Sequence, residues 1–306
     1  MKKILFISAL FALPFLAVAQ DEEPEPPKDG WTKSGNATLL FNQAAFNAEW
    51  TGGGTSNYAA NGALTYDANY RKGKLTWDNR LMAEYGITKT RDQEFTRKTN
   101  DRFELNSIVG RQIKETKWYY SWFANFRTQL SNGYEFIEDE TTGEETRVVT
   151  TKFLSPAYFQ TGPGLLWKES DNLKVNISPA TLRLIIVDDQ FTTVPNNQAA
   201  IDAYNEAGPY FGVDANETIR YELGASINAY AKFEIMDNVT AENVLQLYSN
   251  YLEDPQNVDV DYTLNLLLKV NEWITANFTF QAIYDDNAVK GFQIRETLGI
   301  GVGYKF

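Results

Sequence analysis

Asp259 and Asp261 are two positions apart in a segment of alternating apolar and polar residues. An extended backbone would place both carboxylates on one face, roughly 7 Å apart, which is within the range of an inverting glycosidase pair. The chain has no histidine, so the Ser–His and Asp–His arrangements that move protons near neutral pH cannot be built. The other interpretation is that both aspartates form ion pairs with facing lysine and arginine side chains, and the charges around them favour it.

Other sequence signatures of catalysis are missing. There is no glycine-rich phosphate loop, no zinc-binding HExxH, no calcium-binding EF-hand and no GxSxG nucleophile. The chain also has no cysteine, which excludes disulfides and a lipoprotein anchor. A net charge of −12 argues against binding to nucleic acid. We therefore predict no enzyme, no cofactor and no assigned metal site.

Charged residues recur on the polar face of the alternating segments, and acids and bases there are nearly equal in number. A pore selective for one sign of charge would show an excess of the other sign. The balance favours a lumen that is cross-braced by ion pairs or that admits only small or neutral solutes. The residues predicted to line it are Arg80, Glu84, Arg102, Glu104, Arg127, Arg220, Glu222, Asp259 and Asp261.

The elements that must position these residues are strands, because alternation with a period of two recurs along the chain. The clearest case runs from Thr218 to Ile235, about three times the usual strand length of a soluble sheet. The segments that we predict as strands are 33–41, 57–70, 74–88, 102–113, 118–130, 152–168, 173–187, 218–235, 239–251, 258–270, 273–285 and 292–306.

The connections between these twelve segments alternate between short and long. The short ones are 71–74, 114–116, 169–172, 236–238 and 271–272, and the mostly longer ones are 42–54, 89–101, 131–151, 188–217, 253–257 and 286–291. Six tryptophans fall near the short-turn ends, where an indole prefers the membrane interface. We predict an all-β fold: a transmembrane antiparallel outer-membrane β-barrel of about 12 strands, with short periplasmic turns and long extracellular loops. A large soluble antiparallel barrel or sandwich is the alternative.

The two ends of the chain agree with a route to the outer membrane of a Gram-negative bacterium. Residues 1–19 have the layout of a signal peptide cleaved near Ala19. Residues 20–30 form an acidic, proline-rich leader that we expect to be flexible, followed by the barrel over 31–306. The last strand alternates apolar residues up to Tyr304 and Phe306, a pattern that looks like the signal read by the barrel-assembly machinery.

Several stretches resemble a family of Bacteroidetes outer-membrane proteins known only as domain of unknown function 3078. The resemblance lies in FNAEWTGGGTSNY, KGKLTWDNRLMAEYG, RLIIVDDQ, YELGASINAYAKFE, LYSNYLEDPQNVDVDY and the closing GVGYKF, among others. It extends over nearly the whole chain after the signal segment. It implies the barrel and its compartment, but it brings no activity and no functional residues.

The long loops carry the excess of acids. The predicted cation-binding candidates in loop 131–151 are Glu138, Asp139, Glu140, Glu144 and Glu145, since calcium takes clustered carboxylates. A hydrated surface that resists aggregation is the other interpretation. Loop 188–217, with a short helix expected over 197–207, has two interpretations: a lid or constriction, or a loop that lies on the rim.

Two functions follow from these patterns. The first is a narrow passive or gated channel for small solutes. The alternative is a structural or adhesive surface barrel with a closed lumen, whose acidic loops bind divalent cations, lipopolysaccharide or a partner protein. In both cases membrane lipid is a partner, and nothing in the sequence sets an oligomeric state.

Overall fold

The computed structural model describes residues 29–47, 54–285 and 289–306. The signal segment with its cleavage point, most of the leader and the seventh tryptophan, Trp50, lie outside these residues. Within them, no helix is both long and apolar enough to cross a membrane. The strands are β1 Gly30–Ala44, β2 Asn57–Lys72, β3 Leu75–Thr90, β4 Arg97–Gln112, β5 Trp118–Thr128, β6 Gly133–Glu138, β7 Glu145–Thr151, β8 Ala157–Ser170, β9 Leu173–Ile186, β10 Ile219–Met236, β11 Val239–Asn250, β12 Asp259–Lys269, β13 Ile274–Asp285 and β14 Val289–Lys305.

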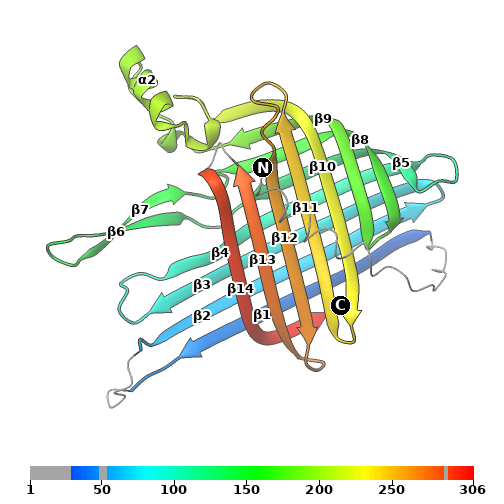
Figure 1. Ribbon diagram of the computed structural model, residues 1–306, viewed down its shortest axis with the longest axis horizontal. Helices are drawn as coiled ribbons and strands as arrows, with labels where there is room; N and C mark the ends of the chain where they lie inside the picture. Colours follow the sequence, from blue (N-terminus) through cyan, green and yellow to red (C-terminus); the bar gives the residue numbers. More distant parts are fainter. Residues whose placement is uncertain (1–28, 48–53, 286–288) are drawn as a thin grey trace.

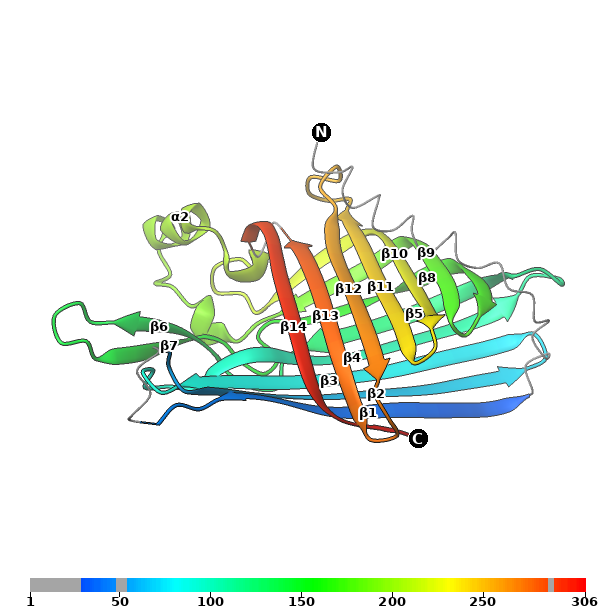
Figure 2. The same ribbon diagram turned by 60° about the horizontal axis from the view of Figure 1, so that its bottom comes forward.

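Twelve of these strands close into one antiparallel barrel, which confirms the predicted fold class. Their order around the ring is β1-β14-β13-β12-β11-β10-β9-β8-β5-β4-β3-β2. Consecutive barrel strands pair with each other, because short turns and hairpin loops make antiparallel neighbours the simplest connection. In Figures 1 and 2, β10–β14 form one layer that crosses over the layer of β1–β5. The barrel is therefore flattened, and side chains from opposite strands can meet inside it.

The outer face of the barrel is apolar. On β14 the side chains of Leu298 and Ile300 are 68% and 61% exposed, whereas on β10 Tyr221 is 66% exposed beside the buried Glu222. Such alternation, apolar outside and polar inside, is what a barrel in a bilayer requires. At the short-turn end the indole of Trp31 lies 5.2 Å from the Tyr70 ring, as measured between centroids. This aromatic group matches the predicted interfacial belt.

The seam between the first and last strands is the shortest pairing in the ring. Five residue pairs join β1 to β14, from Asn36↔Lys305 to Leu40↔Gly301, and two hydrogen bonds of 2.7 and 3.0 Å join Gly35 to Phe306. Along its other edge, β14 pairs with β13 from Val289 onward. Only the C-terminal end of β14 thus closes the ring. This end carries Tyr304 and leads to Phe306, the two residues of the predicted assembly signal.

Two long loops contain structure that the alternation did not fully predict. Strands β6 and β7 form a separate two-stranded sheet within the predicted loop 131–151, and the strand predicted from Lys152 begins at Ala157. The expected helix in loop 188–217 is present as α2, Gln198–Ala207, capped by the Asn197 side chain. Short 3-10 turns η2, Asp189–Phe191, and η3, Tyr210–Gly212, flank it.

Candidate functional site: the barrel lumen

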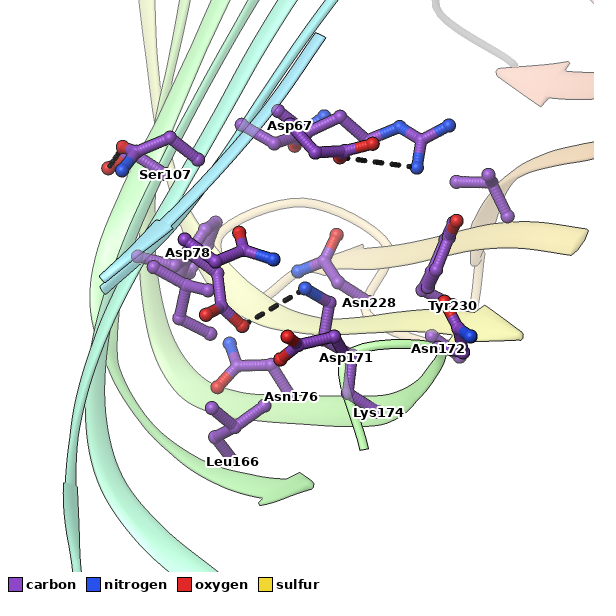
Figure 3. A pocket seen from close by; sticks show the side chains of 18 of the residues that line it. Asp67, Asp78, Ser107, Leu166, Asp171, Asn172, Lys174, Asn176, Asn228 and Tyr230 are labelled. Atoms are coloured by element: carbon purple, nitrogen blue, oxygen red, sulfur yellow. Dashed lines mark hydrogen bonds and ion pairs between the residues drawn. The ribbon is translucent and has the colours of Figure 1, made fainter. Parts of the chain in front are cut away.

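A cavity of about 280 Å³ occupies the short-turn half of the lumen. It is lined by residues of β1–β5 and β8–β11, and it extends to Asp171 and Asn172 in the β8–β9 turn. Figure 3 shows Asp67, Asp78, Asn228 and Tyr230 facing one another around this space. In the long-loop half, two further cavities hold only about 30 Å³ each. The lumen is therefore roomy near the short turns and packed toward the long loops.

Asp78 lies in the wall of this cavity. Its carboxylate accepts hydrogen bonds from Lys168 Nζ at 2.5 Å and from Lys174 Nζ at 3.0 Å, although all three side chains come from different strands. Lys168 Nζ also lies 2.7 Å from Asp171 in the turn. Burial alone would raise the pKa of Asp171, but Lys168 and Arg71 outweigh it and lower that pKa to about 2. These charges fix the β8–β9 turn to the wall.

Arg80 forms a bridge across the lumen. Its Nη2 donates to Glu242 Oε1 at 2.6 Å, and β3 and β11 stand on opposite sides of the ring. Tyr230 Oη donates to the other oxygen of Glu242 at 3.1 Å. This Arg80–Glu242 brace lies beside the cavity. It shows that the opposite strands β3 and β11 are close enough for their side chains to bond across the lumen.

Glu104 collects donors from both layers of the barrel. It is 1% exposed and accepts from Arg102 Nε at 2.7 Å. Asn106 and Asn125 from its own layer and Gln246 from β11 each donate to its Oε1 at 2.8 Å. A buried carboxylate with this many donors is stable as an ion, so Glu104 joins the two layers of the barrel in the middle of the lumen.

Asp259 and Asp261 belong to the same packing. Asp261 Oδ2 lies 2.5 Å from Arg127 Nη1 and 3.4 Å from Arg102 Nη2. Asp259 pairs with Arg183, whose Nη2 also lies 3.3 Å from Asp285 Oδ2. Both aspartates are thus held by arginines, as the second interpretation predicts, which leaves no free carboxylate pair for glycoside hydrolysis.

The remaining predicted lumen residues lie toward the long loops. Arg220 Nε donates to Glu222 at 2.8 Å, and Arg220 also pairs with Glu253 and donates to the Gly212 carbonyl at 2.7 Å. Glu84 lies 3.5 Å from Arg295 Nη2 on the last strand. The loop after β9 is therefore tied to the barrel wall through Arg220.

The acidic candidates of the β6–β7 hairpin are not gathered into one site. Glu138 and Glu145 face each other across the two strands, but Glu145 pairs with Arg97 on β4. Asp139 caps the turn by accepting from the Thr141 and Thr142 amides at 2.8 and 2.9 Å, and these bonds lower its pKa. Across the residues with assigned structure, no group of three or more acids is placed to hold a metal ion. Cation binding by these loops stays a prediction.

Sequence reasoning missed Lys168, which binds Asp78 beside the cavity, and two residues that line the cavity, Asn176 and Asn228. Lys168 was overlooked because it follows Trp167 at the end of a strand, although the alternation of the outward Trp167 with an inward Lys168 could have indicated it. Asn176 and Asn228 carry no charge, so a search for ionisable groups passes over them, and their role emerges only from the three-dimensional arrangement.

The fold and lumen define a closed antiparallel barrel with an apolar wall and a polar, ion-paired interior. The profile of the family described as "Protein of unknown function (DUF3078)" matches residues 41–134. A search of curated proteins finds no match. Among solved structures, the translocator domain of autotransporter NalP from Neisseria meningitidis is 10% identical, with a TM-score of 0.37, over 100% of this chain and 96% of that one. An outer membrane channel from Pseudomonas putida F1 is 8% identical, with a TM-score of 0.39, over 94% of this chain and 98% of that one.

Proposed function

We propose that this protein is a gated, narrow channel for small solutes in the outer membrane of a Gram-negative bacterium. The observation that carries the proposal is the division of the lumen into a cavity of about 280 Å³ and a packed half closed by ion pairs that cross the lumen, from Arg102 and Arg127 to Asp261. Space for a solute lies on one side of the closure. The closure itself consists of side chains, which can rearrange without unfolding the barrel.

The apolar wall supports the membrane location. Side chains such as Leu298 and Tyr221 would be costly to expose to water in such numbers, whereas a bilayer accepts them. Closure of the ring satisfies backbone hydrogen bonds that lipid cannot. In this arrangement the cavity opens toward the periplasm and the packed half faces the long extracellular loops.

The Arg127–Asp261 pair in the packed half offers a direct test. Replacing both residues, Arg127→Ala with Asp261→Ala, removes a pair of opposite charges together, and Arg102 keeps Glu104 as its partner, so no unpaired charge is left buried. We expect the wild-type protein in planar bilayers to be closed for most of the time, and the double variant to show frequent steps of reproducible conductance. A double variant as silent as the wild type, with both shown to be folded, would contradict gating by this ion pair.

A matched control removes an ion pair that lies outside the lumen. Lys117 Nζ lies 2.5 Å from Glu169, and both side chains are exposed near the short turns. Lys117→Ala with Glu169→Ala changes the charges equally, yet should leave the conductance at the wild-type level. An increase equal to that of the Arg127 and Asp261 variant would show that loss of any ion pair loosens the barrel.

The second candidate is a structural or adhesive surface barrel whose lumen never opens. The specific observation in its favour is the projecting hairpin β6–β7, which extends beyond the barrel in Figure 2 and carries most of the exposed acids of its loop. Deleting Glu138–Glu145 should weaken calcium-dependent surface binding or outer-membrane integrity if this candidate is correct. The same deletion should leave the conductance unchanged if the first candidate is correct.

A further inference from the structure

We propose that the lumenal cavity is a binding site for a neutral, polyhydroxylated molecule about the size of a monosaccharide. The inference goes beyond the channel, because binding in the short-turn half does not require passage through the closed half. Four features of the cavity support it: size, charge balance, hydrogen-bonding groups and an apolar wall.

The size favours a single small molecule. A volume of about 280 Å³ lies at the lower limit of small-molecule pockets, which run from roughly 300 to 1,000 Å³. An oligosaccharide, a peptide or a lipid chain would not fit without opening the braces beside it. The adjoining small cavities of about 30 Å³ do not extend this space.

The charges in the lining cancel. Its acids are Asp67, Asp78 and Asp171, and its bases are Arg80, Lys174 and Lys232. Most are already paired: Arg80 with Asp67 at 3.5 Å, and Lys174 with Asp78 at 3.0 Å. A charged ligand would have to compete with these partners and would leave one of them uncompensated. The lining therefore favours a molecule without net charge.

Buried hydrogen-bond donors in the wall lack acceptors. Asn176 is 3% exposed, and its Oδ1 accepts from Ser121 at 2.7 Å. Its Nδ2, like Asn228 Nδ2 and Arg80 Nε, has no hydrogen-bond partner among the described residues. In Figure 3 the Asn228 amide points into the space between Asp67 and Asp78. Buried donors left unpaired are costly, and ligand hydroxyls that reach them would supply acceptors.

Hydroxyl groups suit this wall better than a purely accepting ligand. Each hydroxyl both donates and accepts, so it can accept from an amide such as Asn228 and donate to a carboxylate such as Asp67. The apolar part of the lining, with Phe123, Leu166 and Tyr230, would face the C–H groups of a sugar ring. An apolar wall with a few convergent polar groups is typical of sites for small ligands.

Binding can be measured directly on the folded full-length barrel. We would record saturation-transfer difference NMR in lauryldimethylamine oxide micelles, avoiding glucoside detergents, with three probes of one size: D-glucose, D-gluconate and D-glucosamine. Saturable transfer to glucose that exceeds transfer to both charged probes is expected. No saturable transfer to glucose, or stronger binding of gluconate or glucosamine, would overturn the proposal.

Asn228→Ala tests the location of the site. It removes a donor that has no partner in the described structure, so the fold should persist, while the Kd for glucose should rise about tenfold. Asn132→Ala, at an exposed position outside the lumen, is the control and should keep the wild-type Kd. An unchanged Kd in Asn228→Ala would place the sugar elsewhere. Glucose binding by a barrel that never conducts would overturn the channel but not this site.

Discussion

Glu104 accepts hydrogen bonds from both layers of the barrel, so its substitution should lower the stability of the fold. Glu104→Gln keeps the size of the side chain but replaces one acceptor by an amide donor, which then faces the donors Asn106, Asn125 and Gln246. Arg102, 8% exposed, loses its closest negative partner. Because breaking a buried ion pair leaves an uncompensated charge, we expect the free energy of unfolding to fall by about 3 kcal/mol, as measured by urea unfolding in lipid vesicles.

The control for this prediction is Glu138→Gln in the exposed turn region of the β6–β7 hairpin. It makes the same chemical change where water solvates both forms, so the free energy of unfolding should change by less than about 0.5 kcal/mol. Equal effects of the two substitutions would show that Glu104 is not held as the structure describes.

At this scale, the sequence predicts which residues point inward but not which of them meet. Alternation alone places Glu104, Arg127 and Asp261 on polar faces. Their partners depend on the flattening of the ring, because Arg80 can reach Glu242 only when opposite strands approach. A round barrel with the same alternation would have different ion pairs. The uncharged Asn176 and Asn228 have no sequence signal for the same reason.

Among the elements, the β1–β14 seam is where a small change should have the largest effect. Gly301 pairs with Leu40, and a Cβ built on it would lie 2.7 Å from the Leu40 Cα. The glycine is needed because the two backbones approach so closely there. We expect Gly301→Ala to reduce the fraction of folded barrel, at a cost of about 2 kcal/mol, measured by the mobility difference between unheated and heated samples on SDS gels.

Gly62→Ala provides a matched control within a strand. A Cβ on Gly62 would have the Tyr85 carbonyl oxygen as its nearest neighbour, at 4.0 Å, so the folded fraction should equal that of the wild type. If Gly301→Ala also folds fully, the seam must tolerate a wider separation than the structure shows.

The elements were the part of the structure most open to prediction. A period of two sustained over 18 residues, as in β10, is typical of a long strand and incompatible with the 3.6-residue period of a helix, so all twelve barrel strands could be located. The hairpin β6–β7 was missed because its strands of 6 and 7 residues are short and rich in Glu and Thr, which hides the alternation. Its stability comes instead from contacts such as Arg97 stacked on Phe136.

For the molecule as a whole, the two ends of the barrel differ in what they carry. The cavity, the aromatic belt and the short turns share one end, and the hairpin and α2 share the other. Barrels of the outer membrane place short turns in the periplasm and long loops outside. On that basis the cavity would receive its ligand from the periplasm, and the packed half would separate it from the exterior.

Single cysteines can test this orientation, since the natural chain has none. In intact cells, Glu138→Cys in the hairpin should react fully with a membrane-impermeant maleimide. Asp237→Cys, in the short turn between β10 and β11, should react only after the outer membrane is permeabilised. Both positions are exposed, so access to the thiol, and not burial, determines the rate. Labelling of Asp237→Cys but not Glu138→Cys in intact cells would reverse the orientation and place the cavity at the cell surface.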